Sequence, residues 1–232
     1  MRLAIMQPYL FPYIGYFQLI NAVDKFVLLD TVNFITRGWI NRNRIIVNGQ
    51  EHMFSVPLKH ASQNLIIKDI CLAADTAWRE KFMNTLRHSY HRAVNFTEAY
   101  SLIEAIIDSA GTHITDLIRH SLAVINDYLG LSTQIIPTSS GYHNDTLKAA
   151  HKILDICNQE GADEYINPIG GMELYDREEF SRQGIRLHFL KTNAMRYHQT
   201  AEPFIPHLSI IDVLMNNSRA DTINLLSQYE LV

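Results

Sequence analysis

The sequence predicts an α/β protein with a Rossmann-like, mostly parallel sheet, a β-hairpin and an inserted all-helical block. Short apolar runs followed by loops and amphipathic helices occur towards both ends of the chain, and this alternation is typical of parallel sheets. Between residues 75 and 130 the apolar residues recur at helical spacing, without an intervening strand. We therefore assign residues 1–74 and 131–232 to the two halves of the α/β domain, and residues 75–130 to the helical insertion.

The first thirty residues have the frame of a βαβ unit. Residues 2–6 predict a buried strand, residues 15–23 a helix, and residues 25–29 a second strand. Pro8 and Pro12 stiffen the loop after the first strand, because each fixes its own φ and favours extended geometry in the preceding residue. Ligands of such units usually bind at the carboxyl ends of the strands. This loop is therefore the first candidate for a binding site.

Residues 44–58 predict a β-hairpin, because Asn48 and Gly49 separate two runs of strand-forming residues. An Asn-Gly pair readily takes the positive φ angles of a type I′ turn. Residues 64–72 predict a further short strand, since apolar and polar residues alternate there.

The central segment predicts three helices, which we expect to form a subdomain over the site. The first begins at Asp75, where apolar residues recur every fourth position. The second spans residues 96–110, and the third spans residues 113–129 and ends at Gly130, a common C-terminal stop signal.

Strands and helices alternate again after residue 130, which indicates parallel pairing through right-handed crossovers. The expected strands are residues 133–137, 164–167 and 185–190. The expected helices are residues 145–161 with a cap at Asp145-Thr146, residues 174–183, a helix capped by Ser209, and a last amphipathic helix near residues 221–229.

Composition excludes several classes of protein. The net charge of −4 argues against a protein that binds nucleic acid or anionic membranes nonspecifically. Cys71 and Cys157 are far apart and are expected to be buried thiols in a reducing compartment. The short apolar run at residues 2–6 does not fit a signal peptide, and no run has the length of a transmembrane helix. We expect a cytoplasmic protein without a transmembrane segment.

Tyr13, Gly15 and Tyr16 are the first candidate site residues. Residues 13–16 stand where nucleotidylyl transferases carry a His-x-Gly-His signature, and the order of strand, proline-containing loop, glycine and helix is similar to theirs. A tyrosine can donate a hydrogen bond to a phosphate, but it cannot supply an imidazolium cation. We expect both tyrosines to act at a ligand held by Gln7 and Gly15. The alternative is that they only pack against the edge of the sheet.

The densest group of cationic and amide side chains follows the second strand. Guanidinium groups bind carboxylate or phosphate, whereas amides and an indole ring suit sugar hydroxyls and faces. Strand alternation would place Arg37, Trp39 and Asn41 on one face, and Arg42 and Arg44 on the other. The alternative is a solvated strand that leads into the hairpin.

Other candidates also lie at predicted strand ends. Asp30 is expected to bind a ribose hydroxyl or metal, or to cap the next turn. Gly170 and Gly171 would let the backbone approach a ligand closely. His198 is a candidate general base, with Gln199 beside it.

No metal site is predicted. His88 and His91 have helical spacing, but no acidic or sulfur ligand lies near them in the sequence.

Several segments together resemble the WbqC-like protein family. The similarity lies in Gln7-Pro8, Phe11-Pro12-Tyr13-x-Gly15-Tyr16-Phe17, residues 26–30, Arg37-x-Trp39-x-Asn41-Arg42-Asn43, Gly161-Ala162-Asp163-x-Tyr165-Ile166 and Phe204-x-Pro206-x-Leu208-Ser209-Ile210-Ile211-Asp212. The resemblance implies a place among bacterial genes for O-antigen and related cell-surface polysaccharides, with a suggested glycine-transferase role.

The leading hypothesis is a transferase that binds a small-molecule substrate, either ATP or a nucleotide-linked sugar, between Gln7 and Tyr16. The Arg37–Arg42 segment would then hold anionic or hydroxyl groups of this ligand, with His198 as the base. The alternatives are a noncatalytic binding or scaffold protein of polysaccharide assembly and a nucleotide sensor.

Overall fold

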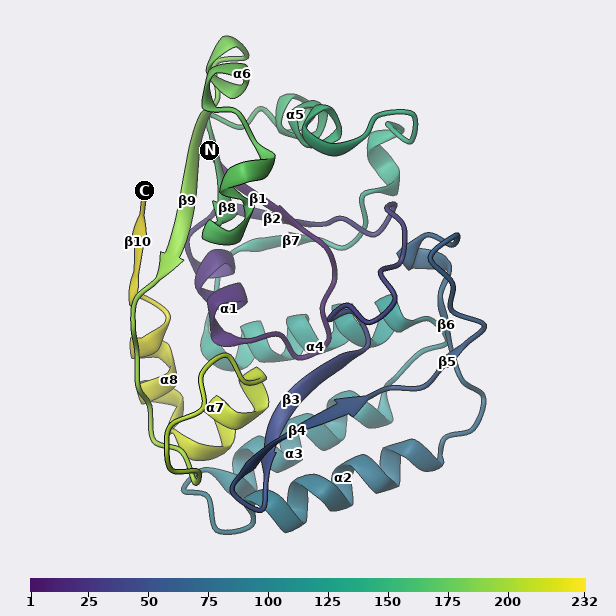
Figure 1. The fold of residues 1–232 in the computed structure, drawn as a ribbon, viewed down its shortest axis with the longest axis vertical. Helices are drawn as coiled ribbons and strands as arrows, with labels where there is room; N and C mark the ends of the chain where they lie inside the picture. The colour runs from purple at the N-terminus through teal and green to yellow at the C-terminus, as the bar shows by residue number, and fades with distance from the viewer.

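The computed structural model describes residues 1–232 and is organised around one six-stranded sheet (Figure 1). β10 pairs antiparallel with β9, and the other five strands are parallel, which confirms a mixed α/β fold with a mostly parallel sheet. In spatial order the strands are β10 (Tyr229–Leu231), β9 (Arg186–Thr192), β8 (Glu164–Pro168), β1 (Arg2–Met6), β2 (Lys25–Leu28) and β7 (Gln134–Ile136).

The direction in which the chain adds strands reverses beside β1. The chain passes from β1 to β2 and β7 on one side, and then returns to β8 and β9 on the other side. β1 pairs with both β2 and β8. In open α/β sheets such a switch point leaves a crevice outside the carboxyl ends of two neighbouring strands.

Helices cover both faces of the sheet. The face covered by α5 (Ala149–Glu160) and α6 (Arg177–Arg182) contains a core of 14 buried residues. The other face packs against α1 (Ile14–Asn21) in a core of 47 buried residues. Within β1, Leu3 and Ile5 belong to the smaller core and Ala4 to the larger, as side-chain alternation in a strand requires.

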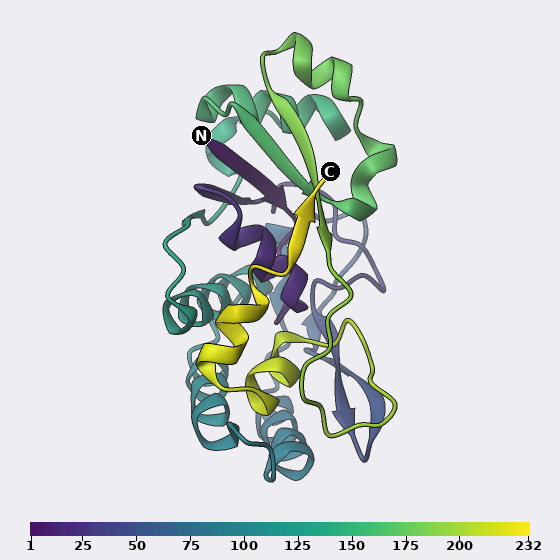
Figure 2. The same ribbon diagram turned by 90° about the vertical axis from the view of Figure 1, so that its left-hand side faces the viewer.

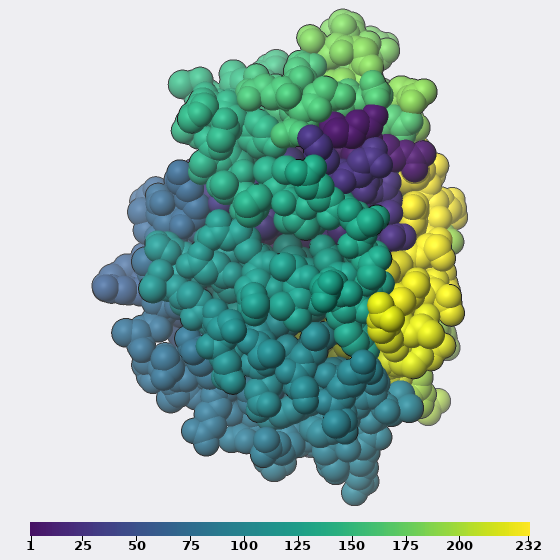
Figure 3. Space-filling model, turned by 180° about the vertical axis from the view of Figure 1, so that it is seen from behind, coloured from purple at the N-terminus to yellow at the C-terminus, as the bar shows by residue number.

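The central segment forms three helices, as predicted. They are α2 (Ala77–Tyr90), α3 (Phe96–Asp108) and α4 (Ile114–Leu129), and Gly130 ends α4 with a φ of 72°. Their apolar faces belong to the same 47-residue core as α1 and the hairpin. From behind, these helices form a broad face with the C-terminal helices along one edge (Figure 3).

The predicted hairpin is confirmed as β3 (Arg42–Val47) and β4 (Gln50–Ser55), and it projects beside the helical block (Figure 2). Asn48 and Gly49 have φ angles of 52° and 74°, as a type I′ turn requires. Beyond the hairpin, the short strand β5 (Leu58–Lys59) pairs with β6 (Cys71–Leu72).

The strand predicted at residues 64–72 is wrong. The chain forms a 3₁₀ turn, η1 (Ile67–Asp69), and then only the two-residue strand β6 (Cys71–Leu72). Ile67 and Ile70 are both fully buried, and their spacing of three residues fits this turn.

The starts of two predicted helices also differ. α5 begins at Ala149 rather than at the predicted cap, and Lys148 at its N-cap makes no side-chain hydrogen bond. α6 begins after Asp176, which caps it, and the 3₁₀ segment η3 (Ile169–Leu174) precedes it.

The C-terminal region contains two helices and a strand. Ser209 caps α7 (Ile210–Asn216) as predicted, and α8 (Arg219–Leu225) follows. The chain then forms β10, where the sequence predicts no strand; only its first residue, Tyr229, falls in the last predicted helix. Among all the helices, none is both long enough and apolar enough to span a membrane.

Candidate functional site

Three adjoining cavities lie at the carboxyl ends of β1, β8 and β9, where the strand order reverses. The Trp39 cavity is about 410 Å³ and is lined by Tyr9, Pro12, Tyr13, Trp39, Asn43, Arg44, Pro168, Ile169, Gly170, Leu190, Thr192 and His207. The Gln7 cavity is about 290 Å³ and shares Tyr9, Pro168 and Gly170 with the Trp39 cavity. The Tyr197 cavity is about 660 Å³ and shares Tyr13, Thr192 and His207 with the Trp39 cavity. None of the residues of the helical block lines these cavities, so the expectation that it covers the site is wrong.

Arginine side chains lie against the indole ring in the Trp39 cavity. The guanidinium carbons of Arg42 and Arg44 are 5.8 and 5.2 Å from the Trp39 ring centroid. Arg44 also donates to Glu51 at 2.9 Å and to the His207 carbonyl at 3.1 Å, whereas its buried Nε has no partner. Trp39 remains 38% exposed, so a face or edge of the indole is open to a ligand.

The segment from Arg37 to Asn41 is a turn, and the predicted extended segment with two faces is wrong. Arg37 has a φ of 62°, and β3 begins only at Arg42. The Arg42 guanidinium donates to the carbonyls of Arg37 and Gly38, which fixes the turn and brings Arg42 over Trp39. Asn41 donates to the Val56 carbonyl at 2.8 Å. Trp39 therefore lines the Trp39 cavity, whereas Arg37, Asn41 and Arg42 line none of the three cavities.

The two candidate tyrosines occupy different environments. Tyr13 lines both the Trp39 and Tyr197 cavities, and burial raises its pKa, so its phenol is a hydrogen-bond donor at neutral pH. Tyr16 is 1% exposed and donates to the Gln7 carbonyl at 2.9 Å, which holds the proline-containing loop from beneath. Only glycine fits at position 15 with the Tyr13 ring in this place, because a Cβ there would overlap the ring and lie 2.9 Å from Thr192 Oγ1.

Gln7 lines the Gln7 cavity, and its buried Oε1 has no hydrogen-bond partner. Gly170 and Gly171 line the same cavity. A Cβ at Gly171 would overlap the amide nitrogen of Asn167, which donates to the Pro168 carbonyl at 3.0 Å. The structure therefore brings Gln7 and both glycines to one cavity.

Asp30 lies apart from these cavities, at the ends of β2 and β7. It is 1% exposed, and its Oδ1 accepts hydrogen bonds from Thr138 Oγ1 and from the backbone nitrogen of Ser139, both at 2.9 Å. This carboxylate fixes the loop after β7, which corresponds to the capping alternative.

His198 is exposed and lines none of the three cavities. Gln199 is turned inward and binds both the nitrogen and the carbonyl of Ile205, so it fixes the loop between β9 and α7. Its Nε2 also donates to Asp212 Oδ2 at 3.0 Å. Both side chains were predicted to act at the ligand, and neither is placed at the cleft.

Asp212 is a fully buried carboxylate behind the Tyr197 cavity. It accepts hydrogen bonds from Tyr90 and Tyr197, each at 2.9 Å, and burial raises its pKa to about 6. Tyr90 in turn accepts from the backbone nitrogen of Ile46 in β3. The carboxylate therefore links the hairpin, α2, α7 and the loop that carries Tyr197.

His207 is the cleft residue that the sequence least reveals. It lines two cavities and makes an edge contact with Tyr13, with the ring centroids 5.9 Å apart at 83°. It lies in a loop far from any predicted strand end, so only the folded chain brings it to β1. Thr192 was detectable in principle, because it is the last residue of β9.

The charged residues that line the three cavities are all cationic. Arg44, Lys191 and Arg196 line them, and neither aspartate nor glutamate does. This distribution stands out in a chain with 24 acidic and 20 basic residues. The cleft is therefore suited to anionic ligands. No group of three or more His, Cys, Asp or Glu side chains is arranged to hold a metal ion.

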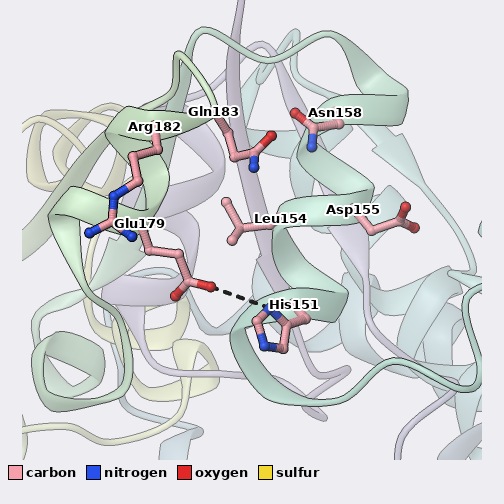
Figure 4. A pocket seen from close by; sticks show the side chains of 7 residues that line it. All are labelled: His151, Leu154, Asp155, Asn158, Glu179, Arg182 and Gln183. Atoms are coloured by element: carbon pink, nitrogen blue, oxygen red, sulfur yellow. Dashed lines mark ion pairs between the residues drawn. The ribbon is translucent and has the colours of Figure 1, made fainter.

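A separate hollow lies between α5 and α6 (Figure 4). His151 Nδ1 lies 3.3 Å from Glu179 Oε1 across it, and the His151 side chain is 76% exposed. Its lining also includes Asp155 and Arg182, and it shares no residue with the three cavities. Exposed side chains of both charge signs give no reason to assign a ligand there.

The fold and the cleft define a mixed α/β protein with ligand-sized cavities at the carboxyl edge of a mostly parallel sheet. The chain belongs to the WbqC-like protein family, whose model matches residues 7–223. It is similar to "Uncharacterized protein Rv1507c" of Mycobacterium tuberculosis, with 28% identity over 218 residues that cover 93% of each chain. No solved structure matches the chain.

Proposed function

We propose that the chain is a cytoplasmic transferase of bacterial O-antigen or related cell-surface polysaccharide synthesis, and that it binds a nucleotide or nucleotide-linked sugar in the Trp39 cavity. One observation carries the proposal: an aromatic cavity with cationic and without acidic residues lies at the switch point of the sheet. A nucleotide-linked sugar combines a flat base, a hydroxylated ring and a diphosphate. The base and the diphosphate match an indole surface and a guanidinium respectively.

The strand order supports a Rossmann-like assignment. The parallel strands β7, β2, β1, β8 and β9 stand in the spatial order third, second, first, fourth and fifth along the chain, as in dinucleotide-binding folds. In those folds the ligand lies in the crevice where the strand order reverses, and the Trp39 cavity is in the corresponding place. The proposal excludes adenylyl transfer, because buried Tyr16 stands in place of the second histidine of the signature.

Each wall of the Trp39 cavity has a role in the proposal. Arg44 binds the diphosphate, and Trp39 stacks on the base or sugar. Tyr13, which burial keeps protonated by raising its pKa, donates a hydrogen bond to a phosphate oxygen. The exposed backbone at Gly170 approaches the ligand closely, since no side chain intervenes.

The transferred group in the proposal is an aminoacyl group, with glycine as the suggested case. The donor would be an activated carboxyl, such as an aminoacyl phosphate or ester: the sugar amine or hydroxyl attacks its carbonyl carbon, and the phosphate or alcohol leaves. Acylation of a sugar amine or hydroxyl requires a base near the acceptor atom. His207 replaces His198 in this role, because His207 lines the cleft beside Tyr13 and His198 lies outside it.

Intrinsic fluorescence tests the nucleotide site, because Trp39 and Trp78 are the two tryptophans of the chain. In the Trp78→Phe variant, Trp39 is the sole tryptophan, and we expect UDP- or dTDP-linked sugars to quench its emission. Titration of ATP in parallel distinguishes the nucleotide classes.

Calorimetry with the Trp39→Ala variant measures the contribution of stacking, which is about 1–3 kcal/mol per base. We expect affinity to fall by about tenfold or more. Trp78→Ala is the matched control, since Trp78 is also partly buried and has Arg79 5.8 Å from its ring. Absence of binding for every nucleotide tested would count against the proposal.

The scaffold alternative is favoured by exposed apolar side chains beside the cleft. Met172 and Leu174 in η3 are 47% and 69% exposed. A Met172→Ser, Leu174→Ser variant and Trp39→Ala should be compared for complex formation and for the polysaccharide product in cells. If Trp39→Ala abolishes the product while the protein stays folded, a transferase is favoured. If only the η3 variant abolishes it, together with complex formation, a scaffold is favoured.

A further inference from the structure

The Tyr197 cavity is a second space of ligand size beside the Trp39 cavity. Tyr13, Thr192 and His207 line both and form the wall between them. The Tyr197 cavity is the larger, at about 660 Å³, and falls within the range of roughly 300–1,000 Å³ that is typical of small-molecule sites. The proposed nucleotide ligand occupies the Trp39 cavity and leaves this space unassigned.

Partly buried hydrogen bonds fix the aromatic wall of the Tyr197 cavity. Tyr197 and Phe204 meet edge to face, with their ring centroids 5.1 Å apart at 83°. The Tyr197 hydroxyl donates to Asp212 at 2.9 Å and accepts from Gln199 Nε2 at 2.9 Å. The remaining wall includes Ile14, at the start of α1. The cavity therefore has a preformed apolar surface.

The charges at the mouth of the Tyr197 cavity favour anions. Lys191 and Arg196 line it, and neither forms an ion pair with any carboxylate of the chain. Glu230 is opposite Lys191 in the β9–β10 ladder, but the two side chains form no ion pair. The nearest buried carboxylate behind the wall, Asp212, is bound by tyrosine hydroxyls and does not line the cavity.

We propose that the Tyr197 cavity is a second ligand site, which takes a small anion with an apolar or aromatic body while the Trp39 cavity holds the nucleotide-linked sugar. Lys191 and Arg196 bind the anionic group, and Tyr197 and Phe204 pack against the apolar body. His207, in the shared wall, contacts both ligands. The simultaneous occupancy rests on the proposed function, whereas the anion site itself does not.

The first experiment is calorimetry of the full chain with 1-naphthyl phosphate and 1-naphthoate, with neutral 1-naphthalenemethanol as the uncharged analogue. We expect an anionic probe to bind with a stoichiometry of one molecule per chain. The neutral analogue should bind at least tenfold more weakly. A preference for one probe identifies the head group as phosphate or carboxylate. Equal binding of all three, or binding of none, would overturn the anion site.

Matched variants locate the bound probe. Lys191→Met with Arg196→Met should weaken binding of the anionic probe at least tenfold. Lys81→Met with Arg92→Met removes the same charge from exposed residues that line none of the three cavities, and it should change affinity less than twofold. Circular dichroism and thermal melting check that both double variants stay folded. Equal losses in the two double variants would mean that only net charge matters, and would overturn the site.

Competition separates this proposal from the proposed function. Trp39→Ala should weaken UDP-linked sugar and leave probe affinity within twofold. The probe should bind the wild-type chain with similar affinity in the presence of saturating UDP-linked sugar. Competitive displacement would instead mean one extended site across both cavities and would overturn the second site. Probe binding at Lys191 and Arg196 without any nucleotide binding would sustain the anion site and reject the nucleotide proposal.

Discussion

The Phe11 carbonyl joins three distant parts of the chain. It accepts hydrogen bonds from Asn43 Nδ2 and Ser209 Oγ, each at 2.7 Å. Phe11 is fully buried, so loss of both donors would leave the carbonyl without a partner. Asn43→Ala and Ser209→Ala each leave one donor in place. Since an unpaired buried polar group costs about 1–3 kcal/mol, we expect the double variant to lose about 1–2 kcal/mol beyond the sum of the single losses.

The assay is a double-mutant cycle on the free energy of unfolding from urea denaturation. The cycle cancels the contacts that each side chain makes alone. For Asn43 these are the bond to the Leu10 carbonyl and the bond that its Oδ1 accepts from the nitrogen of Arg44, and for Ser209 the bond that it accepts from the nitrogen of Ile211. What remains is the interaction energy between the two substitutions, which arises because both donors bind the same Phe11 carbonyl.

Thr222→Ala is the matched control for Ser209→Ala, because Thr222 is also fully buried and its hydroxyl donates to the Ser218 carbonyl, within the first turn of α8. Its combination with Asn43→Ala should be additive within about 0.5 kcal/mol. If Asn43→Ala and Ser209→Ala are additive within the same limit, the shared-acceptor reasoning is refuted.

Three further predictions concern Asp212, Gly15 and Gly171. Burial raises the pKa of Asp212 to about 6, from roughly 3.9 in an unfolded chain, so the folded state binds this proton more tightly. The contribution of Asp212 to the free energy of unfolding should fall by up to roughly 3 kcal/mol between about pH 4 and pH 6. Urea titrations at several pH values give the free energy of unfolding of wild type and of Asp212→Asn. Its change with pH should differ between the two proteins over this range, and parallel pH curves would contradict the prediction. Gly15→Ala should weaken nucleotide-sugar binding about tenfold or more in calorimetry, since its Cβ displaces the tyrosine ring two residues earlier. Unchanged affinity would show that the ring position is irrelevant. Gly171→Ala should lower stability by about 1–3 kcal/mol in thermal denaturation, because its Cβ overlaps Asn167. Gly170→Ala, whose Cβ meets no atom within 4 Å, should stay within about 0.5 kcal/mol.

Local signals predicted most elements of the fold. Asn48 and Gly49 specify the hairpin turn through their positive φ angles, and Gly130 ends α4 for the same reason. The signals failed where tertiary contacts decide the structure. β10 spans only Tyr229–Leu231, which is too short to show a strand pattern, and the sequence predicts no strand there. Its strand conformation depends on the antiparallel ladder with β9.

The strand-end rule placed part of the candidate site, because Gln7, Tyr13 and Gly170 all line cavities at the carboxyl edge. The rule could not show which polar side chains form hydrogen bonds within the protein and are therefore unavailable to a ligand. Arg42 donates to the Gly38 carbonyl and Asn41 to the Val56 carbonyl. No residue pattern in the sequence distinguishes such structural hydrogen bonds from ligand binding.

The stretch after β1 acts as a binding platform only because two other segments fix it. The Phe11 carbonyl receives one donor from the hairpin and one from the segment before α7, so the loop is held on both sides. Asp212 makes a second connection between these regions, through Tyr90 to the nitrogen of Ile46 and through Tyr197 to the cleft wall. The Trp39 and Tyr197 cavities therefore share one buried framework. It follows that a ligand in either cavity contacts segments that this framework already holds together, and little of its binding energy is spent on ordering them.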